Sequence, residues 1–274
     1  MKLRSVMAKL RGKGRDQVPT GLEASVIPDL PTVIRPNEGP MVVPDTEAAE
    51  VIARNLQGAA NDLERLYYSH RGHLAFKWHH YLKVYDRYLG RYRNRPLRLL
   101  EIGVMDGGSL EIWRKYFGQE AVIFGIDISE RCAAFDGHGG AVRIGDQSDT
   151  TFLEKTVLEM GGVDVVIDDG SHIASHQRAS FRTLFPMLSP DGIYICEDVH
   201  TAYWEGWEGG LQRPGTFIER AKGIVDQMHG WYAPVPTSPA DLDFLRSVQS
   251  VSFFDSMVII EKGQKERPYA VAVR

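Results

Sequence analysis

The stretch that decides the fold is Val163-Asp164-Val165-Val166-Ile167-Asp168-Asp169-Gly170-Ser171-His172, in which an apolar run ends in two carboxylates and an imidazole. A second apolar run, Gly192 to Cys196, ends in the acidic pair Glu197-Asp198. If the two runs are neighbouring parallel strands, both polar sets lie at one edge of the sheet, where open α/β sheets bind ligands. The pattern therefore predicts a metal and acid/base site.

Other apolar runs extend this pair of strands into a larger sheet. Strands are predicted over Leu97 to Ile102, Val122 to Asp127, Ala141 to Ile144, Val163 to Ile167 and Gly192 to Cys196, and helices over Ser109 to Phe117, Thr150 to Met160 and Ser175 to Leu188. This alternation predicts an α/β fold with a mostly parallel sheet and helices on both faces. The turn residues 189–192 should stop the last helix. Two final runs, Ser247 to Phe254 and Met257 to Glu261, predict an antiparallel hairpin.

Three regions are predicted along the 274 residues: a basic, proline-rich flexible arm over 1–45, a helical cap over 46–95 and a catalytic domain over 96–274. The arm is interpreted as a solvated tail, with weak contact to an anionic membrane surface as the alternative. In the cap, a helical segment is predicted from Lys77 to Leu89. Its stripe Lys77-Trp78-His79-His80-Tyr81 is expected to pack, with Tyr81 as a candidate cofactor contact.

Composition narrows the classes of function. The net charge of −4 and the isoelectric point near 6.1 predict no nucleic-acid partner. No apolar stretch approaches the roughly 18 residues of a membrane span, and no secretory signal is found, so a cytoplasmic location is predicted. Cys132 and Cys196 lack metal-type spacing and are expected to be buried free thiols in a reducing compartment.

The first half of the predicted sheet has the features of a nucleoside-cofactor site. The first strand runs through Glu101 and Gly103 into a glycine-rich turn, and Ser109 is predicted to cap the next helix, whose free N–H groups can bind an anion. Asp127 ends the second strand about 24 residues beyond Gly103, where a carboxylate can accept ribose hydroxyls. Asp146 and Gln147 follow the third strand and are candidates for reading an adenine edge.

The motifs EIGVMDGGSL, GIDI, IGDQSD, VIDDGSH and CEDVHTAYW together resemble the class I S-adenosylmethionine-dependent methyltransferases. More narrowly, they look like the metal-dependent sugar O-methyltransferases of natural-product pathways, the mycinamicin methyltransferase-like group, and their cephalosporin hydroxylase-like relatives. The resemblance spans Tyr67 to Lys262. It implies a Rossmann-like methyltransferase sheet, with Glu101 and Gly103 at the methionine, Asp127 at the ribose and Asp146 at the adenine. Asp168 is assigned to the cofactor side.

The carboxylates of Asp169, Glu197 and Asp198 are hard oxygen ligands suited to Mg²⁺ or a similar divalent cation. The resemblance implies this same set, and it implies His172 as the general base. His176 and His200 are the rivals for that role, and His200 is the stronger of the two because it follows the second acidic pair directly. The alternative interpretation is that these acidic residues cap the following helix and solvate a loop. The loop from Thr201 to Gly210 is interpreted either as an acceptor-binding lid or as a surface Ω-loop held by its tryptophans.

These observations predict an S-adenosylmethionine- and Mg²⁺-dependent O-methyltransferase acting on a sugar hydroxyl of a glycosylated small molecule or a nucleotide sugar. A nucleotide-dependent oxidoreductase or hydroxylase of secondary metabolism is the alternative, although no dinucleotide glycine fingerprint is present. A third hypothesis is a binding module that retains the fold without turnover. The resemblance also implies self-association into a homo-oligomer.

Overall fold

The computed structural model describes residues 43–232 and 239–273. The predicted arm, with its possible membrane contact, lies almost entirely outside these residues. The chain divides into two compact units, residues 1–55 and 56–274. Helix α2 (Asp45–Gln57) spans this division and has no buried residue. Among the described residues, no helix has both the length and the apolar character that a membrane crossing needs.

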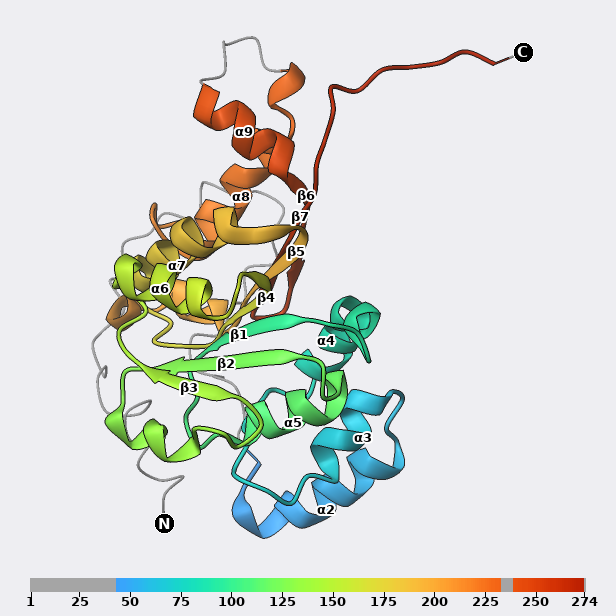
Figure 1. The fold of residues 1–274 in the computed structure, drawn as a ribbon, viewed down its shortest axis with the longest axis vertical. Coiled ribbons are helices and arrows are strands. Elements are labelled where there is room, and N and C mark those ends of the chain that lie inside the picture. Colours follow the sequence, from blue (N-terminus) through green and yellow to red (C-terminus); the bar gives the residue numbers. More distant parts are fainter. Residues whose placement is uncertain (1–42, 233–238, 274) are drawn as a thin grey trace. The chain divides into compact units, whose positions relative to one another are not determined.

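The second unit is built on a mixed seven-stranded sheet with the order β3-β2-β1-β4-β5-β7-β6 (Figure 1). The five strands β1 to β5 pair in parallel, whereas β7 pairs antiparallel with both β5 and β6. The sheet consists of β1 (Arg98–Ile102), β2 (Val122–Asp127), β3 (Ala141–Ile144), β4 (Val163–Asp168), β5 (Leu188–Cys196), β6 (Val248–Phe254) and β7 (Met257–Lys262). This arrangement confirms the predicted Rossmann-like methyltransferase sheet with its C-terminal hairpin.

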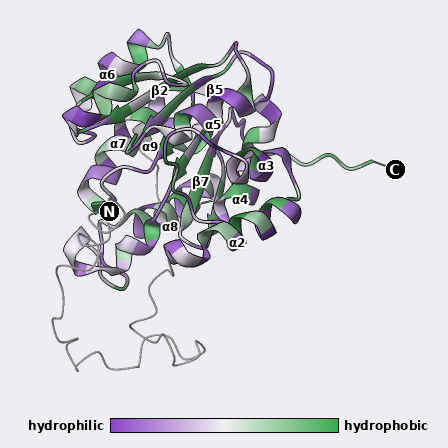
Figure 2. Cartoon of the chain, turned by 90° about the horizontal axis from the view of Figure 1, so that it is seen from below, coloured by the Kyte–Doolittle hydropathy of each residue, from purple (hydrophilic) through white to green (hydrophobic). Residues whose placement is uncertain are grey.

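Helices cover both faces of this sheet because successive strand residues point to opposite sides. Leu99 and Ile167 belong to a core shared with α3 (Asp62–Tyr68), α4 (Tyr81–Leu89) and α5 (Gly108–Phe117). Leu100 and Val166 face the other core, which includes side chains of α6 (Thr150–Glu159), α7 (Ala174–Met187) and α8 (Phe217–Met228). Figure 2 shows mostly hydrophobic strands between helices of mixed hydropathy. The last helix, α9 (Pro239–Ser247), leads into β6.

Three local predictions were wrong. Helix α4 begins at Tyr81, so Lys77 lies in the preceding non-helical segment. Residues 189–192 do not form a separate turn but lie within β5, where a shift in register accommodates them opposite β4. Ser109 is not the N-cap of α5, because Gly107 takes that position with a φ of 80° that glycine adopts readily.

Candidate active site

The carboxyl ends of β4 and β5 lie side by side, as the sequence predicted. Asp168 is paired with Cys196 across the two strands and with Ile102 of β1 on the other side. The backbone then continues the sheet pattern, because the amide of Asp169 donates to Ile102 O at 2.9 Å and that of Glu197 donates to Asp168 O at 2.9 Å. Both acidic pairs therefore emerge from the sheet at the same edge.

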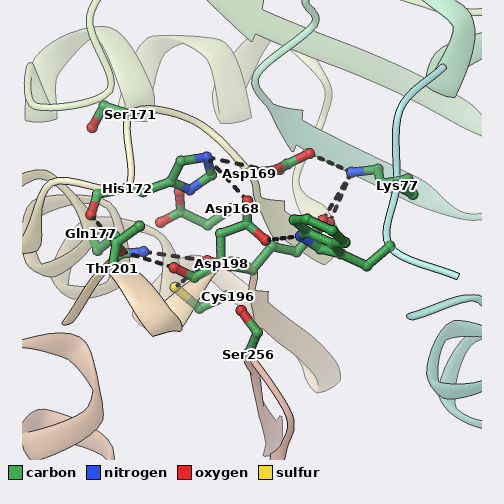
Figure 3. Close-up of polar contacts among 12 residues, drawn as sticks. Lys77, Asp168, Asp169, Ser171, His172, Gln177, Cys196, Asp198, Thr201 and Ser256 are labelled. Carbon is green, nitrogen blue, oxygen red and sulfur yellow. Dashed lines mark hydrogen bonds and ion pairs between the residues drawn. The ribbon is translucent and has the colours of Figure 1, made fainter. Parts of the chain in front are cut away.

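His172 lies between two carboxylates, one from each strand end (Figure 3). Its Nε2 is 3.8 Å from Asp169 Oδ1 and 3.7 Å from Asp198 Oδ2. Both separations exceed hydrogen-bond length, yet one ligand atom from each of the three residues lies within 4.8 Å of the others. The Nδ1 atom of His172 is buried and has no hydrogen-bond partner among the residues that the structure describes. This spacing leaves room for an ion or a substrate oxygen among the three groups.

Two of the three residues that form this gap adopt strained backbone conformations. His172 has a φ of 58° and Asp198 a φ of 52°. Left-handed conformations are uncommon for residues other than glycine, and they persist where the surrounding structure imposes them, often at functional sites. At Asp198 the constraint is visible, because its Oδ1 accepts hydrogen bonds from Trp78 Nε1 at 2.8 Å and Tyr81 Oη at 2.7 Å.

Lys77 joins the site and was missed as a functional residue. Its ammonium donates to Asp169 Oδ2 at 2.6 Å and to Glu197 Oε1 and Oε2 at 2.9 and 3.1 Å, and it lies 3.3 Å from Glu101 Oε1. The interpretation that the stripe from Lys77 to Tyr81 only packs was therefore wrong for Lys77. A lysine inside an aromatic, apolar stretch is the signal that the sequence offered, because such an ammonium is buried only with charged partners.

Burial disfavours the charged forms of the ionisable groups in this site. It raises the pKa of Glu197 well above its ordinary value and also raises that of Asp169, although Lys77 opposes both shifts. Burial alone would lower the pKa of Lys77, but Asp169 and Glu197 outweigh it and raise the pKa instead. The hydroxyl of Tyr85 also donates to Glu197. The carboxylates thus outnumber the cations around them, which is the electrostatic condition that favours a bound divalent ion.

The two candidate bases differ in their surroundings. His172 Nε2 faces the carboxylate gap, as described above. His200 Nδ1 is paired with Ser256 Oγ, and its ring packs edge-on against Trp204 at a centroid distance of 4.7 Å. Burial lowers the pKa of His200, and the carboxylate of Asp198 opposes that shift.

The glycine-rich turn after β1 lies directly against the loop after β4 that begins with Asp169 and Gly170, here called the metal-side loop. Gly103 has a φ of 97°, and a Cβ at this position would overlap the carbonyl oxygen of Asp169 and lie 2.8 Å from its carbonyl carbon. Asp127 Oδ2 accepts the amides of Val104 and Met105 at 3.0 and 3.1 Å, so it anchors the same turn. The predicted cofactor residues and the predicted metal residues are therefore adjacent.

Glu101 is fully buried at the base of this turn. Ser109 Oγ donates to Glu101 Oε2 at 2.6 Å, and Trp113 Nε1 donates to its Oε1 at 3.3 Å. Ser109 therefore contributes its hydroxyl to Glu101 rather than a cap to the helix. Because Lys77 reaches Glu101 as well as Asp169, one ammonium connects the two halves of the site.

The remaining predicted cofactor residues have partners within the protein. Gln147 is buried and donates to Asp168 Oδ1 at 3.0 Å, while its own Oε1 accepts the amide of Ser171 at 2.6 Å. Burial raises the pKa of Asp168 to about 6, opposed by hydrogen bonds from Tyr194 and Gln147. Asp146 accepts the amide of Ser148 at 2.7 Å, a bond that lowers the pKa of Asp146.

The predicted acceptor loop folds back on itself. It contains two short 3-10 helices, η3 (Val199–Tyr203) and η4 (Glu205–Trp207). The amides of Gly209 and Gly210 donate to Trp204 O and Ala202 O at 2.9 and 2.8 Å. The rings of Trp204 and Trp207 meet edge-on at a centroid distance of 5.3 Å. These contacts are those of the Ω-loop interpretation, and Tyr203 remains half exposed at the loop surface.

The residues present fit a magnesium ion. Asp169 Oδ1 and Asp198 Oδ2 face one gap, and carboxylate oxygens are the donors that Mg²⁺ prefers, with waters or substrate oxygens completing an octahedron. The buried Nδ1 atom of half-buried His172, which has no partner among the described residues, also marks a site built for more than packing. Glu197 shares Lys77 with Asp169 but directs both of its oxygens to that ammonium.

No protein-family model matches the chain. It is nevertheless similar to curated O-methyltransferases. It is 34% identical over 229 residues to the 8-demethyl-8-(2-methoxy-alpha-L-rhamnosyl)-tetracenomycin-C 3'-O-methyltransferase of Streptomyces olivaceus, covering 79% of this chain and 58% of that protein. It is 36% identical over 205 residues to the mycinamicin VI 2''-O-methyltransferase of Micromonospora griseorubida, covering 69% of this chain and 49% of that protein.

A solved structure resembles the fold closely. This is the MycE methyltransferase of the mycinamycin biosynthetic pathway in complex with Mg and SAH, with a TM-score of 0.65 and 33% identity over 74% of this chain and 55% of that chain. A further complex of MycE also contains mycinamycin VI and has a TM-score of 0.64. The chain thus spans about half the length of the curated relatives and structures it matches.

Proposed function

We propose that this chain transfers a methyl group from S-adenosylmethionine to a sugar hydroxyl with the help of Mg²⁺. The chain is a homologue of the sugar O-methyltransferases of natural-product pathways and has the class I S-adenosylmethionine-dependent methyltransferase fold. The acceptor belongs to the class of glycosylated small molecules or nucleotide sugars. The observation that carries the proposal is the gap between Asp169, His172 and Asp198 beside the glycine-rich turn. The relatives described above are all methyltransferases, so none of them supports the oxidoreductase alternative.

In this proposal the cofactor lies along the ends of β1 to β3. Glu101 and the turn at Gly103 would hold its methionine part. Asp127 accepts the two turn amides and, through Oδ1, the amide of Ser129 at 2.8 Å, and it would hold the ribose through its remaining lone pair. Asp146 is the adenine-side residue. Gln147 and Asp168 act by positioning the loop that carries Asp169, since Gln147 connects the carboxylate of Asp168 to the amide of Ser171 in that loop. Tyr81 acts on Asp198 rather than on the cofactor.

Asp169 and Asp198, with Glu197 as the third carboxylate, would hold the cation. When bound, Mg²⁺ lowers the pKa of a coordinated hydroxyl. His172 Nε2 faces the same gap and accepts the hydroxyl proton as the new O–CH₃ bond forms and the S–CH₃ bond of the sulfonium breaks. The product is the methyl ether together with S-adenosylhomocysteine and a protonated His172. Release of that proton to solvent restores the base.

The test follows a labelled methyl group from S-adenosylmethionine into a panel of glycosides and nucleotide sugars. The expected result is transfer to at least one acceptor, lost on chelation. Asp169→Ala should abolish transfer while the affinity for S-adenosylhomocysteine, measured by calorimetry, stays within a few-fold. Unchanged turnover in Asp169→Ala would remove the metal from the mechanism, and tight binding of NAD alone would overturn the choice of cofactor.

The base is tested separately. His172→Ala should lower the rate by roughly 10²- to 10⁴-fold with the acceptor still bound, whereas His200→Ala should have a smaller effect. A near-normal rate in His172→Ala would move the role to His200.

A cytoplasmic location and a homo-oligomeric state form part of the same proposal. Fractionation of the producing cells tests the location, and light scattering of the purified chain tests the oligomeric state.

A further inference from the structure

Lys77 reaches both candidate subsites with a single side chain. The side chain is 5% exposed, and its three carboxylate partners come from the ends of three adjacent strands. The backbone at Lys77 is also anchored, because its amide donates to Tyr67 Oη at 2.8 Å. The ammonium is therefore held in place by its own segment as well as by its charge.

The carboxylate oxygens are divided between Lys77 and the gap at His172. Asp169 is shared, since its Oδ2 binds Lys77 while its Oδ1 faces His172. Glu197 is not shared, because Lys77 contacts both of its oxygens and Tyr85 also donates to Oε1. The described residues with mutually close ligand atoms at this gap are Asp169, His172 and Asp198, without Glu197. Lys77 and Tyr85 occupy three of the roughly four lone-pair positions of Glu197, so a cation held by Asp169 and Asp198 competes with Lys77 for this carboxylate.

We propose that Lys77 is a positioning residue that competes with the divalent cation for Glu197 and so sets the metal affinity of the site. Its release has a destination, because Glu101 Oε1 already lies 3.3 Å from the ammonium. Lys77 therefore exchanges one carboxylate for another as the cation takes Glu197. The proposal rests on the proposed metal site, and it goes further by predicting that removing a positive charge from this site strengthens metal binding.

The direction of the effect distinguishes competition from support. An ammonium within hydrogen-bond distance of two metal-side carboxylates repels a divalent ion and occupies its ligands, so removing the charge should tighten binding by about tenfold or more. If Lys77 merely supported the carboxylates, its removal would loosen them and weaken binding. Lys77→Gln is the best variant, because it removes the charge but retains an N–H donor. Lys77→Arg retains the charge and should behave as wild type.

The experiment is calorimetric titration of the whole chain with Mg²⁺ alone, with circular dichroism to verify folding. Lys83→Gln is the matched control. Lys83 lies on α4 and is exposed to solvent, so this substitution removes the same charge from a position outside the buried site. We expect Lys77→Gln to bind Mg²⁺ at least about tenfold more tightly than wild type, and Lys77→Arg and Lys83→Gln to stay within threefold. Adding Asp169→Ala to each variant should remove the binding, which assigns it to this site.

Weaker or unchanged Mg²⁺ affinity in Lys77→Gln, with binding still dependent on Asp169, would overturn the competition and leave the proposed function standing. No Asp169-dependent binding in any variant would overturn the metal site itself. If Lys77→Gln is too unstable for calorimetry, thermal melting decides. Because a ligand that binds the native state stabilises it, Mg²⁺ should then raise the melting temperature of Lys77→Gln more than that of wild type, and an equal or smaller rise would refute the proposal.

Discussion

Gly103→Ala tests the close contact between the cofactor turn and the metal-side loop. At Gly103 the φ is 97°, and a Cβ would overlap Asp169 O and lie 3.3 Å from Gly170 Cα. All of these obstacles are backbone atoms, so no flexible side chain can move aside. A left-handed conformation costs a residue with a Cβ about 1–2 kcal/mol, and overpacking adds about 1–3 kcal/mol. The free energy of unfolding should therefore fall by about 2–5 kcal/mol.

Gly137→Ala is the matched control, because Gly137 has a φ of 82° but no atom of the described residues lies within 4 Å of the added Cβ. It should cost only the conformational part, about 1–2 kcal/mol. Urea unfolding at a constant m-value measures both changes. Gly103→Ala should also weaken Asp169-dependent Mg²⁺ binding, since the displaced backbone carries that ligand, whereas Gly137→Ala should not. Equal stability losses in the two variants, together with unchanged Mg²⁺ binding, would refute the close-contact argument.

Three further predictions concern other parts of the protein. Arg98 donates hydrogen bonds to Asp164, and these outweigh burial and hold the pKa of Asp164 below its ordinary value. The pair therefore stabilises the fold at pH values above the unfolded pKa, and Asp164→Asn should lower the free energy of unfolding by about 1–2 kcal/mol at neutral pH. Urea unfolding measures this difference, which should shrink below about pH 4. Tyr194→Phe removes the 2.6 Å hydrogen bond to buried Asp168 and should lower the free energy of unfolding by about 1–3 kcal/mol; no loss would mean that the bond contributes nothing net. Burial raises the pKa of Cys132 to about 12 and that of Cys196 well above its ordinary value. A thiol reagent should therefore label neither cysteine in the native chain between about pH 7 and pH 9, and it should label both after denaturation. Rapid labelling of the native chain would contradict their burial.

The strand pattern predicted most of the sheet because its information is local. Each buried strand of a parallel sheet is a short apolar run, and its carboxyl end is followed at once by the residues that face a ligand. Asp169 and Asp198 could therefore be placed at one edge from their positions after two such runs. The bounds of β2 and β3 were predicted to the residue, since apolar runs there end at polar loops.

Local patterns failed where a contact partner decides the outcome. Ser109 has the side chain of an N-cap, but Glu101 accepts its hydroxyl and Gly107 supplies the backbone conformation instead. Residues 189–192 have turn composition, yet they lie within β5 because Leu188 and Ile193 on either side of them pair with Val163 and Val165 of β4. In each case a tertiary partner outweighed the intrinsic preference of the residue, as it commonly does at helix and strand ends.

The sequence by itself determined the sheet, its hairpin and the carboxylates that converge at the ends of β4 and β5. Only the tertiary structure decided which groups surround them. Lys77 meets Asp169 across 92 positions and Glu197 across 120, and Tyr81 meets Asp198 across 117. No periodicity spans such separations, because they depend on the path of the whole chain over the sheet. The ammonium that pairs with Asp169 and Glu197 could therefore be located only once the segment before α4 was seen to cross the ends of these strands.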